Sequence, residues 1–439
     1  MSVQWKGGSR WLVRGIGLGV LIILTVPDVH RWLWRQGWGE LDLLMGAFLV
    51  SYLVVPLMRR IAYRVGAVDE PDDRKVHTTP TPLLGGGAIY SAFMLMLVLN
   101  WHSLGGTEVM GIALGATVIF GVGVFDDVRG LPAMVRLVAQ VVAACIAMGG
   151  GVTVTFLPNE WGLWGVIGEW IITLIWFVGI TNALNFMDGM DGLAAGTAGL
   201  NALFFSLIAW RNGEAGHLII LVSTVLLGAC LGFLPYNFRR NRPALIFLGD
   251  GGSTFLGFVL AGIAVMGNWG EDQFVGIAIP LLVLGVPIFD MTLTTVMRIK
   301  DGYVRSFRQW IEFTGRDHFH HRLADLGIGK RAAVLVIYLV TTWLGLSAMV
   351  LDKARGVEAI FALLQSGIVF LLIAAFMIFV KEQYLRWAEL VRETIGLSAL
   401  HEEDALKEAR KGDKERGRGG EGETSSHPLT RSHQKIEGA

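Results

Sequence analysis

The chain has 439 residues, of which 53% are hydrophobic and 17% are charged. An average soluble domain carries about 25% charged residues and fewer apolar ones, so this composition excludes an ordinary cytosolic enzyme and a disordered chain. The 37 Lys and Arg residues balance 37 Asp and Glu residues, which excludes a general nucleic-acid binder. Cys145 and Cys230 lie in apolar runs and give neither a disulfide framework nor a metal-binding spacing. The composition predicts an integral protein of the lipid bilayer.

The apolar residues form runs that are long enough, or nearly long enough, to cross a membrane. A helix needs about 20 residues to cross a hydrocarbon core of about 30 Å. Eleven runs approach or reach this length, and they cover 41–58, 83–101, 109–124, 134–148, 166–180, 192–210, 218–234, 253–267, 274–297, 333–351 and 358–380. We therefore expect an all-α polytopic membrane protein with about eleven transmembrane helices.

A twelfth apolar run covers residues 11–27. It carries Arg14 near its start, as a signal peptide does, but it ends in Val26-Pro27-Asp28, which fits a signal-peptide cleavage site poorly. We predict an uncleaved extra helix in this segment.

The changes in composition divide the chain into three parts. An N-terminal extension covers 1–40, a membrane-embedded domain covers 41–380 and a charged tail covers 381–439. Apolar residues at helical spacing predict that the tail begins as a surface helix. From Gly412 onward the apolar period is lost, which predicts disorder.

Lys and Arg predict the orientation, because they concentrate in cytoplasmic loops. If successive spans alternate in direction, one set of loops holds 18 Lys and Arg residues and the other set holds 3. The basic loops are 59–82, 125–136, 181–191, 235–252 and 298–332. We expect these loops and the tail on the cytoplasmic side.

Asp126 and Asp127 end an apolar run in one of the basic loops. Adjacent carboxylates repel each other, and a carboxylate at membrane depth costs about 2.5–3.5 kcal/mol. A divalent cation relieves both penalties, and Mg²⁺ takes one or two protein carboxylates together with substrate phosphates. A solvated acidic pair beside Arg129 is the alternative.

Two amides and two carboxylates recur at a spacing of three residues between two spans: Asn182, Asn185, Asp188 and Asp191. This spacing places successive members on adjacent faces of a helical turn. Gly189 and Gly192 loosen the turn and let the backbone approach a ligand. We interpret the cluster as part of a polar site, with helix capping as the alternative.

Asp250 lies in a Gly-rich turn, Gly249-Asp250-Gly251-Gly252-Ser253, which leads into an apolar run. Backbone N–H groups at a helix start can bind an anion. Asp250 repels a phosphate unless a metal ion stands between them, so this turn also indicates Mg²⁺. A capped Gly-Asp turn without a ligand is the alternative.

The most basic loop contains His318, His320, His321 and Arg322 within five positions. These side chains can bind a diphosphate, and no set of cysteines or carboxylates gives them the spacing of a zinc site. Lys75 and His77 add cations before a second Gly-rich turn, Gly85-Gly86-Gly87. Solvated basic loops are the alternative for both segments.

The position of these clusters distinguishes two classes of membrane protein. A secondary transporter places its polar site near mid-bilayer, often on broken helices. An enzyme that acts on a cytosolic substrate gathers its polar groups at one face, as the basic loops do here. No Lys is followed by Ser or Thr, so the chain has no Walker A motif for ATP-driven transport.

The chain resembles the polyprenyl-phosphate N-acetylhexosamine-1-phosphate transferases, glycosyltransferase family 4, in five ordered motifs. These are DDVRGLPAMVRLVAQ, NALNFMDGMDGLAAG, FLGDGGSTFLG, VPIFDMTLTTVMRI and DHFHHRL, and the resemblance covers about residues 41–330. It implies an eleven-helix catalytic domain in the bacterial inner membrane, with its active-site loops in the cytoplasm. Phe319 interrupts the three consecutive histidines typical of the peptidoglycan branch. The chain is therefore more similar to the branch that initiates O-antigen, enterobacterial common antigen or teichoic-acid polymers.

The resemblance also implies the substrates and the reaction. A UDP-N-acetylhexosamine would donate its sugar 1-phosphate to undecaprenyl phosphate and release UMP. Among these donors, UDP-GlcNAc is favoured. The lipid phosphate would attack directly, with a covalent aspartyl-phosphate as the alternative. Three other functions stay open: a phospho-N-acetylmuramoyl-pentapeptide transferase, a secondary transporter and an inactive scaffold. A homodimer is the one assembly we consider.

The resemblance assigns a role to each motif residue. Mg²⁺, or Mn²⁺ in its place, would bind Asp126, Asp127 and Asp250. The residues near the reacting phosphates or the nucleotide would be Asp188, Asp191, Asn185 and Phe247, the last beside the uracil. Asn237 matches a family asparagine, although the segment after it is longer here. The implied cationic contacts to the phosphates are Lys75, Arg136, His318, His320, His321 and Arg322.

Overall fold

The computed structural model of the chain describes residues 7–70, 80–240, 242–270, 272–313, 315, 318–324, 329–351, 356–375, 379, 386, 390 and 391. Contacts within the chain define two units, Met1–Ala374 and Ala375–Ala439. Nearly all the described residues belong to the first unit. The helix and the disorder expected in the tail fall almost entirely outside the described residues and stay predictions.

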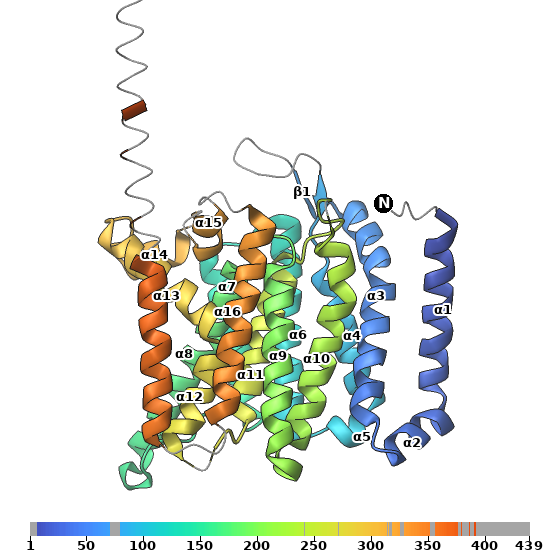
Figure 1. The fold of residues 1–439 in the computed structure, drawn as a ribbon, viewed down its shortest axis with the longest axis horizontal. Helices are drawn as coiled ribbons and strands as arrows, with labels where there is room; N and C mark the ends of the chain where they lie inside the picture. Colours follow the sequence, from blue (N-terminus) through green and yellow to red (C-terminus); the bar gives the residue numbers. More distant parts are fainter. Residues whose placement is uncertain are drawn as a thin grey trace, which may run out of the picture. The chain divides into compact units, whose positions relative to one another are not determined.

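The first unit is a bundle of α-helices (Figure 1). Among its described residues, eight helices are long and apolar enough to cross a membrane, and up to ten spans result if each of two bent pairs is one span. The eight helices are α3 (Gly39–Val65), α6 (Thr107–Arg129), α8 (Leu163–Phe186), α9 (Leu193–Arg211), α10 (His217–Asn237), α11 (Gly249–Met266), α16 (Lys330–Leu351) and the unlabelled helix Gly356–Ala375. Two shorter apolar helices are α4 (Gly86–Leu99) and α7 (Ala133–Gly149). The predicted all-α polytopic membrane fold is confirmed.

The two bent pairs occur where proline interrupts an apolar run. The predicted N-terminal helix is α1 (Gly7–Thr25), and it meets α2 (Pro27–Arg35) at 73°. The run 274–297, expected as a single span, consists of two helices, α12 (Gln273–Val283) and α13 (Gly285–Lys300), which are bent by 76° against each other. Pro287 has no N–H to donate to the carbonyl of Val283, which favours a break between the two helices at this point.

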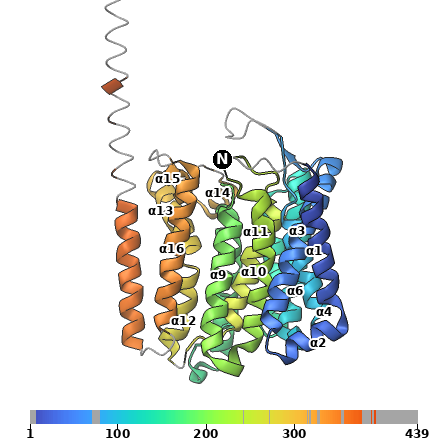
Figure 2. The same cartoon turned by 45° about the vertical axis from the view of Figure 1, so that its right-hand side comes forward.

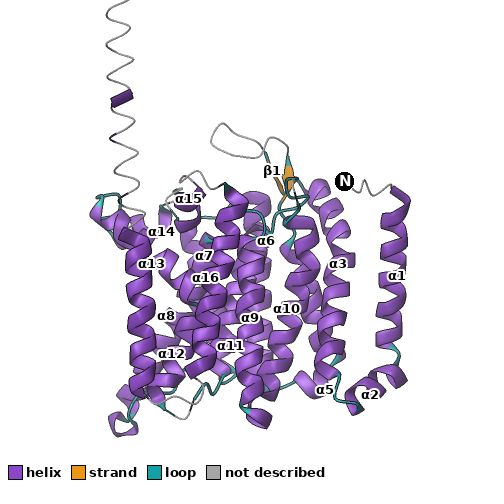
Figure 3. Ribbon diagram, in the orientation of Figure 1, coloured by secondary structure: helices purple, strands orange, loops and turns teal. Residues whose placement is uncertain are grey.

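Short elements cap the two ends of the bundle. They are the helices α5 (Trp101–Leu104), α14 (Phe307–Glu312) and α15 (Phe319–Leu323), the 3₁₀ turns η1 (Asn159–Trp161) and η2 (Gly213–Gly216), and the strands β1 (Val68–Asp69) and β2 (Thr81–Pro82). The strands form an antiparallel hairpin in which Asp69 pairs with Thr81. Figure 3 shows this hairpin at the same end as α14 and α15, which we call the hairpin end.

Three helices form the centre of the bundle. The long helices α9, α10 and α11 are the most buried, and α11 packs against α6 and α8 while α10 packs against α3 (Figure 2). Apolar side chains such as Ile175, Leu339 and Leu371 are exposed around the bundle, as a lipid-facing surface requires. A Cβ on Gly123 of α6 would overlap the backbone of Gly251, so these glycines bring the end of α6 against the start of α11.

Candidate active site

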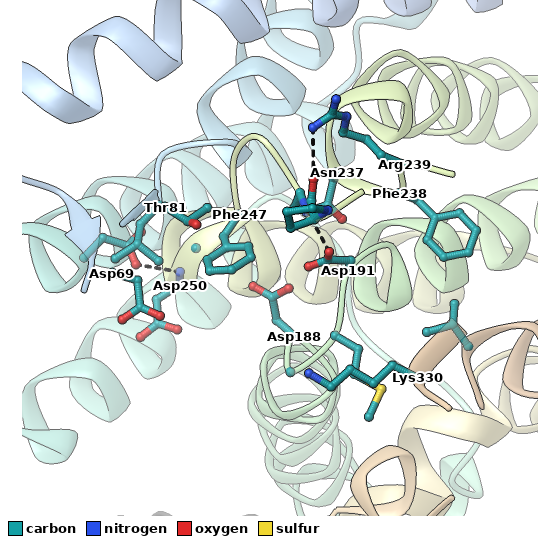
Figure 4. Close-up of a pocket in the computed structure, with 18 of the residues that line it drawn as sticks. Asp69, Thr81, Asp188, Asp191, Asn237, Phe238, Arg239, Phe247, Asp250 and Lys330 are labelled. Carbon is teal, nitrogen blue, oxygen red and sulfur yellow. Dashed lines mark hydrogen bonds between the residues drawn. The ribbon is translucent and has the colours of Figure 1, made fainter. Parts of the chain in front are cut away.

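A cavity of about 740 Å³ lies at the hairpin end (Figure 4). Its walls come from the β hairpin, the end of α6, the segments after α8 and α10, the start of α11, α15 and the start of α16. Nine of the predicted site residues line it: Asp126, Asp127, Arg136, Asp188, Asp191, Asn237, Phe247, Asp250 and His321. Segments far apart in the sequence therefore meet at one place.

Arg136 connects the carboxylates of α6 and α11. Its Nη1 lies 3.0 Å from Asp126 Oδ2 and 3.3 Å from Asp250 Oδ2. The other oxygen of Asp126 accepts a hydrogen bond from the backbone N–H of Leu131 at 2.5 Å. Two carboxylates from separate helices thus converge on one cationic nitrogen.

Asp127 fixes the first turn of α11. Its two carboxylate oxygens accept hydrogen bonds from the backbone N–H groups of Asp250 and Gly251, at 2.8 and 3.1 Å. These N–H groups have no partner within their own helix, and a negative charge there also interacts favourably with the helix dipole. Gly249 precedes this turn with φ of 78°, and a Cβ on it would overlap Asp127. The Asp127 carboxylate therefore sets the backbone position of Asp250.

The fit of these acids to a metal ion can be judged from their arrangement. Within the described part of the chain, no three His, Cys, Asp or Glu side chains form a ready metal site. Mg²⁺ does not require one, because it takes one or two carboxylates and completes its shell with phosphates and water. Asp126 and Asp250 already converge on a single positive charge, that of Arg136. The residues present fit a divalent cation whose remaining ligands come from the substrate, and the ion itself stays a prediction.

The two amides at the end of α8 have different tasks. The Nδ2 group of Asn185 donates to Asp250 Oδ1 at 2.8 Å and to Ser253 Oγ at 2.9 Å, which orients the Asp250 carboxylate. Asn182 instead exchanges hydrogen bonds with Gln140 of α7, at 2.7 and 3.1 Å. Asn185 orients a carboxylate of the site, whereas Asn182 joins α8 to α7, and both line the smaller cavity described below.

Asp188 lies in the turn that follows α8. Burial raises the pKa of its carboxyl well above the usual range, and the nearby carboxylates of Asp250 and Asp127 raise it further, whereas a backbone hydrogen bond from Gly249 opposes them. Asp188 therefore keeps a proton more readily than an ordinary aspartate does.

Side chains at the end of α10 and beyond it hold the cavity wall together. Asn237 accepts a hydrogen bond from the N–H of Gly192 at 2.6 Å and donates to the carbonyl of Ile246 at 3.0 Å. Asp191 accepts from the N–H of Ala244 at 2.9 Å. These bonds join the segment after α8 to the segment after α10. Although the segment after Asn237 is longer than in the family, the Asn237 side chain still positions the cavity wall through these two hydrogen bonds.

Phe247 is anchored through its backbone to the β hairpin and the turn after it. Its N–H donates to the carbonyl of Pro82 at 2.8 Å, and its carbonyl accepts from Gly85 at 2.9 Å. The ring faces the cavity near Asp188 and Asp191 (Figure 4). This placement offers an aromatic face to a bound ligand.

The three histidines separate in the structure. His318 is buried, with Nδ1 3.4 Å from Asp290 and Nε2 3.3 Å from Arg298. His320 is 1% exposed and lines neither this cavity nor the smaller one described below. Only His321 lines the main cavity, so the structure does not place all three histidines where a diphosphate would bind there.

Burial determines the protonation state of the His320 imidazole. It lowers the pKa of the imidazole to about 3, although the Asp290 carboxylate 3.9 Å away raises it. His320 is therefore neutral, and its ring packs against Gly189, where a Cβ would overlap Nε2.

Besides His318, His320 and Asn185, two further predicted residues are not placed in the main cavity. Arg322 is half-buried and lines neither cavity. Lys75 lies outside the described residues, so its role stays a prediction.

Several residues of the cavity were not among those predicted from the sequence. Lys330 and Arg331 line it from the start of α16, and Arg239 lines it from the segment after α10. These residues belong to the basic loops 235–252 and 298–332, whose Lys and Arg residues were interpreted only as indicators of membrane orientation. Asp290 was also missed, although its Oδ1 accepts from the N–H of Phe319 at 2.6 Å and so holds the start of α15.

A smaller cavity of about 370 Å³ adjoins the first. It shares five polar residues with the main cavity: Asp126, Arg136, Asp188, Asp250 and His321. It then continues along apolar side chains of α6, α7 and α8, including Ile119, Leu137 and Val178. The carboxylate cluster therefore stands between one polar cavity and one with an apolar wall.

Comparison with known proteins gives a consistent result. Residues 109–268 match the sequence profile of glycosyl transferase family 4. A Bacillus subtilis (strain 168) protein named "Probable undecaprenyl-phosphate N-acetylglucosaminyl 1-phosphate transferase" is 37% identical over 317 residues, which are 70% of this chain and 85% of the relative. A Mycobacterium tuberculosis (strain ATCC 25618 / H37Rv) "Decaprenyl-phosphate N-acetylglucosaminephosphotransferase" is 35% identical over 69% of this chain and 79% of its own length. A Salmonella typhi "Undecaprenyl-phosphate alpha-N-acetylglucosaminyl 1-phosphate transferase" is 27% identical over 67% of this chain and 79% of its own length.

Proposed function

We propose, because this chain belongs to glycosyl transferase family 4, that it transfers N-acetylglucosamine 1-phosphate from UDP-GlcNAc to undecaprenyl phosphate and releases UMP. The relatives support this function through their names, which state a polyprenyl phosphate and an N-acetylglucosamine phosphate group. The structural observation that carries the proposal is the carboxylate cluster between two cavities of different chemistry.

The main cavity suits the nucleotide sugar. Arg239, Lys330, Arg331 and His321 bring cationic and hydrogen-bonding groups to its wall, as a diphosphate requires. Phe247 offers a ring for the uracil. The volume of about 740 Å³ is within the range of ligand-binding pockets, about 300–1,000 Å³.

The smaller cavity suits the phosphate end of the lipid. Its apolar wall between α6, α7 and α8 would contact the prenyl chain. Arg136 and His321 line both cavities, so a lipid phosphate beside them would lie next to the donor diphosphate.

The transfer itself depends on positioning and on charge neutralisation. An oxygen of the lipid phosphate forms a bond to the β-phosphorus, and the bond from that phosphorus to the UMP oxygen breaks, with its electron pair leaving on UMP. The lipid phosphate has a second pKa near 6 (about the value of any phosphate monoester) and needs no strong base. Mg²⁺ would offset the charge of the diphosphate. Asp126 and Asp250 would hold it, while Asp127, the third predicted ligand, also caps α11 through both of its oxygens.

The chain's own residues complete this arrangement. Asp127 and Asn185 orient Asp250 through its backbone and its carboxylate. Asp188, when it keeps its proton, donates a hydrogen bond to a phosphate oxygen instead of repelling it. Arg136 holds Asp126 and Asp250 together before substrate arrives.

The distribution of charge also indicates where the chain and its site lie in the cell. We place the hairpin end in the cytoplasm and the chain in the bacterial inner membrane, because the basic loops lie at this end and nucleotide sugars are cytosolic. The lipid-linked product would initiate a cell-envelope polysaccharide.

Release of UMP by the purified chain tests the function. With undecaprenyl phosphate, UDP-GlcNAc and Mg²⁺, we expect turnover that Asp250→Asn lowers by about 100-fold or more, the scale of losing a preorganised charged group. Asp28→Asn is the matched control, because Asp28 is exposed on α2 and pairs only with Arg31 among the described contacts. Near-normal turnover in Asp250→Asn would remove the carboxylate cluster from the mechanism. Gradient-coupled uptake without UMP release would support the transporter instead.

A further inference from the structure

A second group of cations lies beside the proposed active site and shares Arg239 with it, between α1, α3 and the end of α10. A cavity of about 190 Å³ is lined there by Arg14 of α1, Arg59 of α3 and Arg239 of the segment after α10. Tyr52 and Tyr236 add two phenol groups. The mechanism above uses neither Arg14, Arg59 nor the tyrosines.

The lining combines positive charge with a buried hydroxyl group. It includes three arginines and, among the described residues, no Asp or Glu. Tyr236 is 9% exposed, and its buried hydroxyl lies beside the Arg14 guanidinium and the Tyr52 phenol without a hydrogen bond of standard geometry to any described residue. Such a group costs free energy that a bound acceptor oxygen recovers. Phosphate oxygens accept hydrogen bonds from guanidinium and phenol groups alike.

The rest of the lining is apolar and lies at a membrane boundary. Val55, Pro56 and Leu245 contribute carbon surface to the cavity. Arg59 belongs to the last two turns of α3, and Tyr236 is one residue from the end of α10. A phospholipid presents a phosphate next to hydrocarbon at this level of a bilayer. The cavity is about a quarter of the volume of the main one, 190 against 740 Å³, which is too small for a nucleotide sugar.

We propose that this cavity binds the phosphate head group of an anionic phospholipid. Arg14 and Arg59 pair with the phosphate, and the Tyr236 hydroxyl donates a hydrogen bond to one of its oxygens. Because Arg14 belongs to α1, the N-terminal helix completes the lipid site. This assignment does not depend on the transferase function.

Arg239 connects the lipid site to the main cavity, because it lines both. Its Nη1 donates to the carbonyl of Pro243 at 3.1 Å, and the N–H of the next residue, Ala244, donates to Asp191 at 2.9 Å. A bound phosphate therefore restrains the segment that holds Asp191. If the proposed function is correct, the lipid lowers the KM for the nucleotide sugar more than it changes kcat.

Lipid binding to the delipidated full chain in detergent tests the site. Native mass spectrometry with dioleoyl-phosphatidylglycerol as the probe is expected to show about tenfold weaker binding to Arg14→Gln, the scale of one charge-assisted contact. Arg60→Gln is the matched control, since Arg60 follows Arg59 on the same helix but does not line the cavity, and it should bind as the unmodified chain does. Equal affinity of Arg14→Gln and the unmodified chain would overturn the proposal.

A second variant and two competitors sharpen the test. Tyr236→Phe removes only the hydroxyl, so it should fold normally and still bind the lipid more weakly. Inorganic phosphate should compete poorly, because it lacks the hydrocarbon that contacts Val55 and Pro56. Displacement by inorganic phosphate at concentrations equal to those of the lipid would instead assign a free-anion site. Stronger competition by undecaprenyl phosphate than by phosphatidylglycerol would assign the carrier lipid, and either result contradicts the phospholipid site.

Discussion

Asp127 joins the candidate site to the helix that carries Asp250. Both of its oxygens accept backbone N–H groups at the start of α11. An amide in this position offers one acceptor and turns a donor toward the second N–H. We therefore expect Asp127→Asn to lose activity and also about 1–2 kcal/mol of stability, as the loss of a helix cap does.

Thermal unfolding in detergent checks this difference between neighbouring acids. Asp250→Asn keeps the Asp127 contacts, so its Tm should stay close to that of the unmodified chain while Asp127→Asn melts lower. Equal melting temperatures for the two variants would show that the cap at α11 contributes nothing.

His320 makes the stability of the fold depend on pH. Its pKa is about 3 in the folded protein against 6.5 ordinarily, so below pH 6.5 the unfolded chain binds a proton that the folded chain does not. Stability is therefore lost as the pH falls from 6.5 toward 3, by about 2 kcal/mol at pH 5. Above pH 6.5 both states are neutral and the effect vanishes.

The difference in Tm between pH 7 and pH 5 measures this effect. It should shrink in His320→Gln and stay unchanged in His217→Gln, since His217 is exposed. An acid sensitivity that is the same in all three proteins contradicts a buried neutral His320.

At the scale of elements, the turn after α8 packs against α15 through one glycine. A Cβ on Gly189 would overlap His320 Nε2, so Gly189→Ala pushes apart the elements that carry Asp188 and His321. We expect about tenfold or greater loss of UMP release, because small displacements of reacting groups are costly. The double variant Gly189→Ala/His320→Ala restores the space and should recover part of the activity.

Gly121→Ala is the control for this pair, because a Cβ there would meet no atom within 4 Å. If Gly189→Ala keeps full activity, the close packing of these two elements is not required for the site.

The sequence predicted the helices better than their bends. Long apolar runs fix where membrane helices form, so each of the eleven runs corresponds to a helix or a bent pair. The run 274–297 is apolar throughout, and its composition does not reveal that the chain turns by 76° near Leu284. Pro287 was the available signal, but proline inside helices is also present here without such a break, as Pro56 in α3 shows.

The acidic residues of the site could be predicted from the sequence, because charge beside a membrane span is costly, whereas the basic residues could not, because Lys and Arg are common there. Asp126, Asp188 and Asp250 stood out because acids beside membrane spans are expensive. Lys330 and Arg331 did not, because basic residues flank many membrane helices without chemistry. The burial of His320 and the exposure of His321 to the cavity follow from how α15 packs, which adjacent positions in a sequence do not reveal.

At the scale of the whole molecule, the predicted orientation places the hairpin end in the cytoplasm. Cysteine labelling tests it, with Cys145 and Cys230 first replaced by Ser. Arg129→Cys at the hairpin end and Glu160→Cys in η1 at the other end are both exposed positions. A membrane-impermeant thiol reagent added to intact cells should label Glu160→Cys and leave Arg129→Cys unlabelled until the membrane is opened. The reverse pattern would place the site outside the cell.

In the proposed reaction, the chain transfers a sugar together with its phosphate. The most direct test of this transfer follows a radiolabel placed in the β-phosphate of UDP-GlcNAc, with undecaprenyl phosphate and Mg²⁺ present. We expect the label to move into the lipid fraction as a lipid-linked diphosphate sugar while unlabelled UMP is released. Label that stays in the nucleotide as UDP, or that is trapped on the protein with donor alone, would contradict direct transfer of the sugar phosphate to the lipid.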